Sequence, residues 1–102
     1  ELTIKQRYPA TINTAQEAQK AASAAARVVG ETKVILDADP STGSEDFAYM
    51  LQARPGCYIW LGNGNRDGGC VLHNPHYDFN VEILPIGTSY WVSLVEQELP
   101  IS

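Results

Sequence analysis

The chain has 102 residues, 44% of which are hydrophobic, and a formal net charge of -5. This size and composition predict one small globular domain, or a piece of a larger one. The negative charge argues against non-specific binding to nucleic acid, which needs basic patches, and against an anionic membrane surface. No apolar run approaches the roughly 20 residues of a transmembrane helix, so we expect neither a nucleic-acid nor a membrane partner.

The start of the chain and its cysteines predict a longer parent polypeptide and a reducing compartment. The chain begins at Glu1 without an initiator methionine or a signal peptide, which predicts a start inside a longer polypeptide. Its two cysteines, Cys57 and Cys70, are too few for a disulfide scaffold. They are typical of small reduced thiols, and we therefore expect a cytoplasmic protein.

A strand and a helix are predicted in the first third of the chain. Residues 2–8 largely alternate between apolar and polar side chains, which predicts a half-buried strand. Thr14 and Glu17 have the spacing of a capping box at a helix N-terminus. The helix that follows is rich in alanine, which gives it a thin face, and Gly30 is a typical residue just beyond a last turn.

Two strands around a short helix are predicted in the middle of the chain. Residues 33–36 are mostly apolar and predict a short buried strand. Ser44 is a favourable N-cap for a helix that residues 54–56, Arg-Pro-Gly, would end. Residues 57–61 are apolar on both faces, which predicts a central strand, and the glycine-rich residues 62–69 predict a loop.

The last third of the chain completes an alternating pattern. Residues 70–72 predict a short strand that leads to His73. Asn80 is suited to cap a final helix, which Leu99 and Pro100 would end. The resulting order, β-α-β-α-β-(β)-α, predicts an α/β layer architecture without an internal repeat.

The stretch with the most chemistry is residues 72–80, which holds both histidines of the chain. His73 follows a predicted strand, where one ring nitrogen can bind a metal while a carboxylate or carbonyl holds the other. The Asn-Pro pair after it restricts the backbone and fixes the direction of the ring. That proline disfavours a helical ligand pair with His76. Asp78 is either a carboxylate that supports the site or part of a capping turn. The alternative for His73 is a hydrogen-bonded loop residue, and the alternative for His76 is an exposed loop residue.

Two further interpretations remain open from these residues alone. Cys57, Cys70, His73 and His76 are able in principle to form a structural zinc site, although no CxxC pair is present. The chain also fits a non-catalytic α/β module that binds a partner through exposed sheet edges.

Six stretches, taken together and in order, carry a more specific signal than any of them alone. The chain closely resembles, over nearly its whole length, the C-terminal segment of the hippurate hydrolase type of amidohydrolase. That type belongs to the aminoacylase and carboxypeptidase superfamily of dinuclear metallopeptidases. The matching stretches are Gly43-Ser44-Glu45-Asp46-Phe47, Arg54-Pro55-Gly56-Cys57-Tyr58, Leu61-Gly62-Asn63-Gly64, Leu72-His73-Asn74-Pro75, Tyr77-Asp78-Phe79-Asn80 and Ile83-Leu84-Pro85-Ile86-Gly87.

The resemblance implies a fold and an activity for a longer parent enzyme. Residues 1–12 would be the end of a lid domain, and residues 13–102 the C-terminal part of a three-layer α/β/α catalytic domain. The parent would be a metal-dependent amidohydrolase that cleaves the amide bond of hippurate-like N-acyl amino acids. It would use two divalent metal ions, zinc or manganese, and a glutamate as the general base. The expected partners are a small-molecule substrate and further copies of the parent, joined through the lid domain.

The resemblance also implies roles for single residues. His73 matches the family's last metal ligand, whereas His76 has no matching role. The family's other ligands and its general base lie upstream, and no segment here matches them, so the chain alone is expected to be inactive and to hold no catalytic residue. Val81 departs from the acidic residue that many relatives carry. Residues expected to support the metal site or line the substrate pocket are Glu45, Gly62, Asn63 and Asp78.

Overall fold

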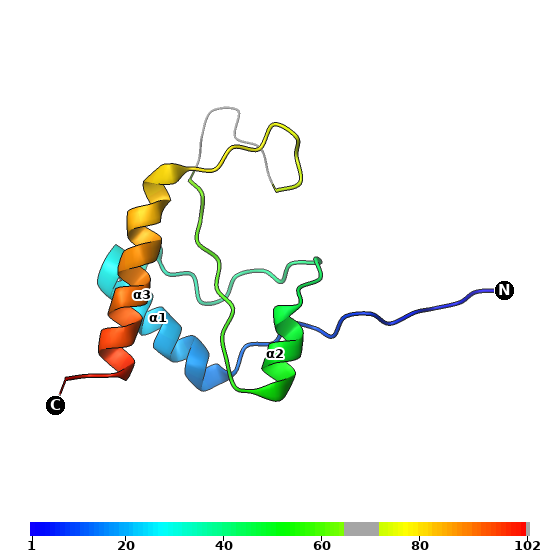
Figure 1. Cartoon of the computed structure of the whole chain (residues 1–102), viewed down its shortest axis with the longest axis horizontal. Coiled ribbons are helices and arrows are strands. Elements are labelled where there is room, and N and C mark those ends of the chain that lie inside the picture. The colour runs from blue at the N-terminus through cyan, green and yellow to red at the C-terminus, as the bar shows by residue number, and fades with distance from the viewer. Residues whose placement is uncertain (65–71, 102) are drawn as a thin grey trace.

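The computed structural model describes residues 1–64 and 72–101 of the chain, and the regular elements in these ranges are helices (Figure 1). No strand occurs within these two ranges, so the predicted α/β architecture is wrong. None of the described helices combines the length and the apolar character that crossing a membrane requires. The elements are α1 (Ala15–Val29), the 3₁₀ turn η1 (Glu31–Lys33), α2 (Phe47–Ala53), the 3₁₀ turn η2 (Val81–Ile83) and α3 (Leu84–Glu98).

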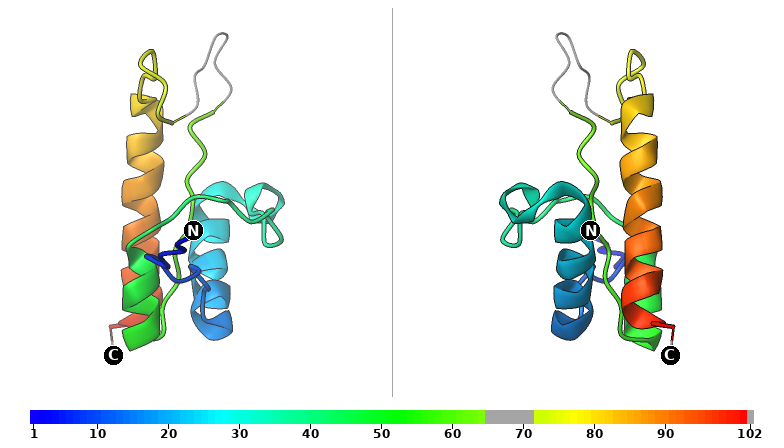
Figure 2. Two further views of the ribbon diagram at one scale, coloured as in Figure 1. Left: turned by 90° about the vertical axis from the view of Figure 1, so that its right-hand side faces the viewer. Right: turned by 90° about the vertical axis from the view of Figure 1, so that its left-hand side faces the viewer.

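Helices α1 and α3 lie side by side and antiparallel, and their contact is the centre of the structure (Figure 2). Ala24 of α1 is fully buried, and its carbonyl accepts a 3.2 Å hydrogen bond from the buried hydroxyl of Ser93 in α3. About one turn along, the Gln97 amide donates to the Lys20 carbonyl at 3.1 Å. Lys20 also forms a 2.8 Å ion pair with Glu98. The thin alanine face of α1 therefore packs against a helix.

The predicted helices are confirmed, but three of their caps differ from the prediction. Helix α1 begins after Thr14 and ends at Gly30, whose φ of 85° suits glycine. The Thr14 hydroxyl makes no capping bond and instead accepts a 3.1 Å hydrogen bond from the Gly56 N–H. At α2 the N-cap position belongs to Asp46 and not to Ser44. Asn80 was predicted to cap the final helix, but it caps η2 through a bond from the Glu82 N–H, and the N-cap of α3 is Ile83.

The segments predicted as strands form no regular element. Residues 2–8 and 57–61 have no regular structure, and residues 33–36 begin inside η1. Of residues 70–72, the first two lie outside the described residues. Residues 57–61 are not buried as a central strand would be, since Trp60 is 67% exposed. A polarity pattern records side chains that avoid water, whereas a strand also needs a neighbouring backbone to pair with.

We expect replacement of Ala24 by leucine to lower the free energy of unfolding by about 1–3 kcal/mol, because the added atoms push α1 and α3 apart. Denaturant titration followed by circular dichroism measures this change. Ala53→Leu is the matched control, since Ala53 is exposed in α2 and leucine has nearly the helix propensity of alanine. Wild-type stability of the A24L protein would contradict the close helix contact.

Candidate functional site

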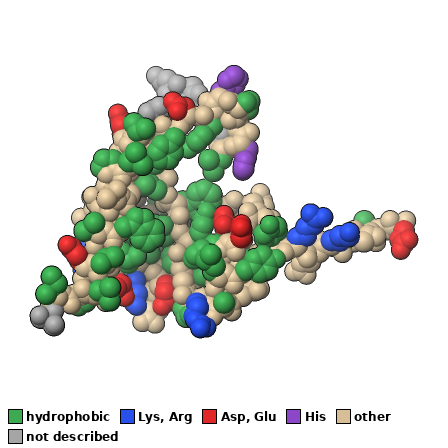
Figure 3. Space-filling view, viewed as in Figure 1, with side chains coloured by type: hydrophobic (Ala, Val, Ile, Leu, Met, Phe, Trp, Pro, Cys, Tyr) green, Lys and Arg blue, Asp and Glu red, His purple; other side chains and the backbone are tan. Residues whose placement is uncertain are grey.

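The predicted ligand His73 lies in a tight exposed turn that its neighbour Asn74 holds together. The Asn74 carbonyl accepts a 2.9 Å hydrogen bond from the Tyr77 N–H, and its side-chain oxygen accepts one of 2.9 Å from the His76 N–H. His73 has a φ of 68°, in the left-handed region that residues other than glycine seldom adopt. Such backbone conformations persist where the surroundings enforce them, and they cluster at functional sites. Figure 3 shows both histidines at one extremity of the molecule.

The described residues bring no complete metal site together. No group of three or more His, Cys, Asp or Glu side chains within them is close enough to hold a metal ion. Of the residues of the alternative zinc site, Cys70 lies outside the described residues. Cys57 is a free thiol, and burial together with the nearby Glu17 raises its pKa. A raised pKa favours the protonated thiol, whereas zinc binds the thiolate.

Asn63 lies against Asn80, and the two side chains bond each other's backbone. The Asn63 side-chain oxygen accepts a 2.9 Å hydrogen bond from the Asn80 N–H. In return, the Asn80 side-chain amide donates to the Asn63 carbonyl at 3.1 Å. The Asn63 side-chain nitrogen also donates to the Asp78 carbonyl at 3.5 Å. The structure therefore brings two of the predicted site residues, Asn63 and Asp78, together just after the turn that holds His73.

A second asparagine, Asn13, bonds the chain at Tyr58, a few residues before Asn63. The Asn13 side-chain oxygen accepts a 2.8 Å hydrogen bond from the Tyr58 N–H, and its amide donates to the Tyr58 carbonyl at 2.9 Å. The Thr14 N–H donates to the Gly56 carbonyl at 2.9 Å beside it. We refer to residues 56–64 as the tethered segment, because asparagine side chains hold both of its ends.

Glu45 lies apart from His73. It stands just before α2, which is separated from the His73 turn along the vertical axis of Figures 1 and 2. Its carboxylate accepts a 3.2 Å hydrogen bond from the Tyr58 hydroxyl and one of 3.2 Å from the Phe47 N–H. Partial burial and then this bond to Glu45 raise the pKa of Tyr58. The Glu45 carboxylate is thus occupied by hydrogen bonds at the start of α2.

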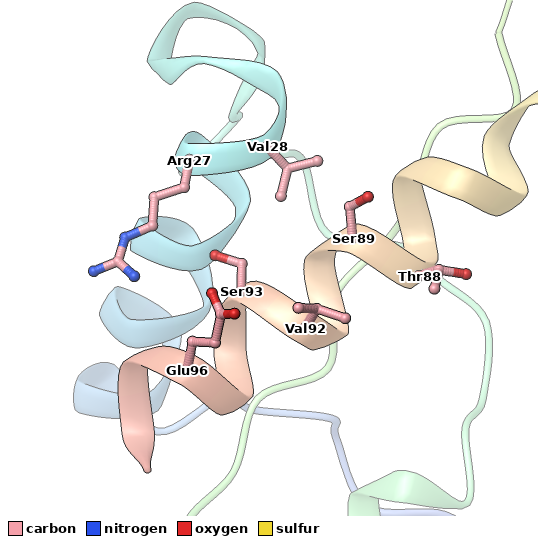
Figure 4. Close-up of a pocket in the computed structure, with 7 residues that line it drawn as sticks. All are labelled: Arg27, Val28, Thr88, Ser89, Val92, Ser93 and Glu96. Carbon is pink, nitrogen blue, oxygen red and sulfur yellow. The ribbon is translucent and has the colours of Figure 1, made fainter. Parts of the chain in front are cut away.

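Gly62 is exposed, and a side-chain carbon added there would meet nothing within 4 Å. The hollows of the surface lie elsewhere. One of about 350 Å³ opens between α1 and α3 beside Arg27 and Glu96 (Figure 4), and another of about 550 Å³ follows the outer face of α1. Neither contains a predicted site residue.

The sequence did not predict that Asn13 and Asn80 would hold distant backbone groups through their side chains. Asn13 was assigned no role, and Asn80 was expected only to cap α3. Their signal in the sequence is weak, because an asparagine that bonds a distant backbone looks like any loop asparagine. One available sign was that Asn63 and Asn80 both fall in the family-like stretches.

Comparison with known proteins places these features in a family. The model of peptidase family M20/M25/M40 matches residues 1–97. The chain belongs to this family. The predicted resemblance is thereby confirmed, and residues 43–47, 54–58, 72–75 and 77–80, on which it was based, lie inside the matched range.

Several curated relatives of the M20/M25/M40 chain are similar in sequence. A putative amidohydrolase, YhaA, of Bacillus subtilis is 37% identical over 82 residues, which are 78% of this chain and 20% of that protein. The hippurate hydrolase of Campylobacter jejuni is 30% identical over 86 residues, 84% of this chain and 22% of that protein. Thermostable carboxypeptidase 1 of Saccharolobus solfataricus is 29% identical over 82 residues, 78% of this chain and 20% of that protein. The chain spans about a fifth of the length of these relatives. No solved structure matches it significantly.

We expect Glu45→Gln to lower the pKa of Tyr58 toward its ordinary value, because the substitution removes the negatively charged acceptor of the phenol proton. A pH titration of ¹³C-labelled tyrosine by NMR measures this pKa. In the wild type, the phenol therefore keeps its proton, and its bond to Glu45, to a higher pH than an isolated tyrosine. Glu82→Gln is the control, since Glu82 is exposed and lies in η2. An unchanged Tyr58 titration in the E45Q protein would contradict the assignment.

Proposed function

We propose that the polypeptide carrying this chain is a metal-dependent amidohydrolase that cleaves the amide bond of N-acyl amino acids. His73 would supply one ligand of its metal site. The observation that carries the proposal is the exposed His73, held at a φ of 68° in a turn braced by Asn74, in a chain of peptidase family M20/M25/M40. A conformation this uncommon is kept where a side chain must point in one direction.

The names of several relatives support the substrate class. Two of them are a hippurate hydrolase and an N-acetylcysteine deacetylase, from Campylobacter jejuni and Bacillus subtilis respectively. Hippurate and N-acetylcysteine are both amino acids that carry an acyl group on nitrogen. Arabidopsis thaliana relatives are named IAA-amino acid hydrolases. A small N-acyl amino acid is therefore the substrate that we propose.

The donor chemistry of His73 fits one coordination position. Its imidazole is exposed, and no other described residue forms a hydrogen bond with it, so a ring nitrogen is available to a divalent ion. Because the described residues hold no group of three ligands, these residues fit a share of a metal site and not a complete one. A pair of divalent ions, when bound, would polarise the scissile carbonyl and activate water. The contribution of this chain is to hold His73 and to fix its direction through Asn74.

The proposal has finer parts that rest on the family-like motifs. The metal ions would be zinc or manganese, and the remaining ligands and the general base would come from residues outside this chain. The isolated chain would accordingly be inactive. We further propose a cytoplasmic enzyme, in keeping with its two cysteines, and a homo-oligomer formed through a lid domain.

We expect His73→Ala in the complete natural polypeptide to lower kcat/KM for hippurate by more than about 100-fold, because loss of a ligand costs more than loss of a residue that supports one. Hippurate hydrolysis is followed through release of glycine, and bound zinc and manganese are measured by elemental analysis. The bound metal should fall together with the activity.

His76→Ala is the matched control for this experiment, since His76 is the other histidine of the same exposed turn. Its activity and metal content should stay within about twofold of the wild type, as for most surface substitutions. Unchanged turnover in the H73A enzyme would refute the ligand assignment. A wild-type enzyme that hydrolyses none of a panel of N-acyl amino acids would refute the function.

A further inference from the structure

We propose that Asn63 and Asn80 work as one unit that positions the turn carrying His73. This inference rests on the proposed function, because it gives the unit a part in amide hydrolysis. Both asparagines are positioning residues in this scheme, since they touch backbone atoms and act through His73. The unit also gives Asn63 a different role from the substrate contact that its sequence position predicts.

The geometry of the pair is reciprocal. The Asn80 N–H donates to the Asn63 side chain at 2.9 Å, and the Asn80 side chain donates to the Asn63 carbonyl at 3.1 Å. Asn80 is only 7% exposed, so its polar atoms depend on protein partners for their hydrogen bonds. Loss of either side chain therefore leaves a backbone group of the other residue without its partner, which costs more than the net value of one exposed bond.

The position of the pair in the chain turns this contact into control of the His73 turn. Residues 78–80 follow directly after the turn that holds His73, and Asn63 bonds the Asp78 carbonyl and the Asn80 N–H. The Asn80 side chain also accepts from the Glu82 N–H at 3.1 Å, so the pair is fixed to η2, which leads into α3. Gly64, with a φ of 81°, follows directly, and a side-chain carbon there would lie 3.5 Å from the Asn80 amide nitrogen. Gly64 is therefore in ordinary contact range of the Asn80 side chain.

The left-handed backbone of His73 is what makes such a support necessary. A residue other than glycine in this region carries a conformational cost and persists only when its surroundings enforce it. Asn74 enforces it locally through two hydrogen bonds. The Asn63–Asn80 pair supports it from outside the turn, because it holds residues 78–80, which follow the turn directly.

Substitution of Asn80 separates this role from helix capping. Asp and Asn are about equally good N-caps, so Asn80→Asp keeps an oxygen for the Glu82 N–H. The same change replaces the NH₂ donor with a second oxygen that faces the Asn63 carbonyl. Gln16→Glu is the matched control, because it makes the same amide-to-carboxylate change at an exposed position in the first turn of α1.

We expect Asn80→Asp in the complete natural polypeptide to lower kcat for hippurate by about 100-fold, the scale of a 1 Å misplacement of a catalytic group. KM should change much less, since substrate contacts are left in place. Asn63→Ala should show the same split, and the N63A/N80D double variant should cost no more than the worse single one, because one unit can be lost only once. The Q16E control should keep both constants.

Hydrogen exchange measured by NMR on the metal-free polypeptide supplies a readout that needs no activity. In the N80D variant, the Tyr77 N–H, which bonds the Asn74 carbonyl, should exchange about tenfold faster than in the wild type. A purely structural pair would leave both the Tyr77 exchange and the kcat of the folded enzyme unchanged, and either result overturns the proposal. If the wild type has no amidase activity, the proposed function fails, while the Tyr77 exchange still decides whether the pair controls the turn.

Discussion

Side-chain amides hold the tethered segment, and most of the structure depends on this constraint. A chain that passes through the middle of a protein without a neighbouring strand must find other partners for its backbone groups. Asn13 offers a donor and an acceptor to the two backbone groups of Tyr58, much as an adjacent strand would. Asn80 does the same at Asn63. Asn13 stands just before the N-cap of α1, and Asn80 stands before η2, which leads into α3, so these bonds tie the tethered segment to the starts of both long helices.

The small hydrophobic core increases the importance of these polar bonds. The buried hydrophobic residues of the described chain are three alanines and Tyr90. Alanine side chains bury little apolar area, so their share of the hydrophobic free energy is small. Large apolar side chains of the tethered segment stay outside this core, and Trp60 contacts the ring of Tyr58 edge-on at 5.8 Å while remaining 67% exposed. Hydrophobic side chains accordingly cover much of the surface in Figure 3.

The helices were predictable from the sequence, whereas the arrangement of the extended segments was not. Helical spacing and the glycine at position 30 are local signals that located α1 and the course of α3, although Asn80 caps η2 and not α3 itself. The strand predictions for residues 2–8 and 57–61 depended on pairing partners that local polarity does not reveal. The same distinction explains Thr14, whose hydroxyl bonds Gly56, 42 residues away, instead of capping its own helix.

The candidate site also has features that residue order predicts and features that depend on distant contacts. The family could be recognised from short stretches, and His73 could be selected within them, because both depend on which residues stand in which order. The support of His73 could not, because the bond from Asn80 to Asn63 joins residues 17 apart. A residue type indicates what chemistry a side chain is able to perform, while its direction in space depends on contacts made elsewhere. For a left-handed histidine in an exposed turn, we propose that those contacts are the amide bonds that hold residues 78–80, so a change at Asn63 or Asn80 would alter the histidine without touching it.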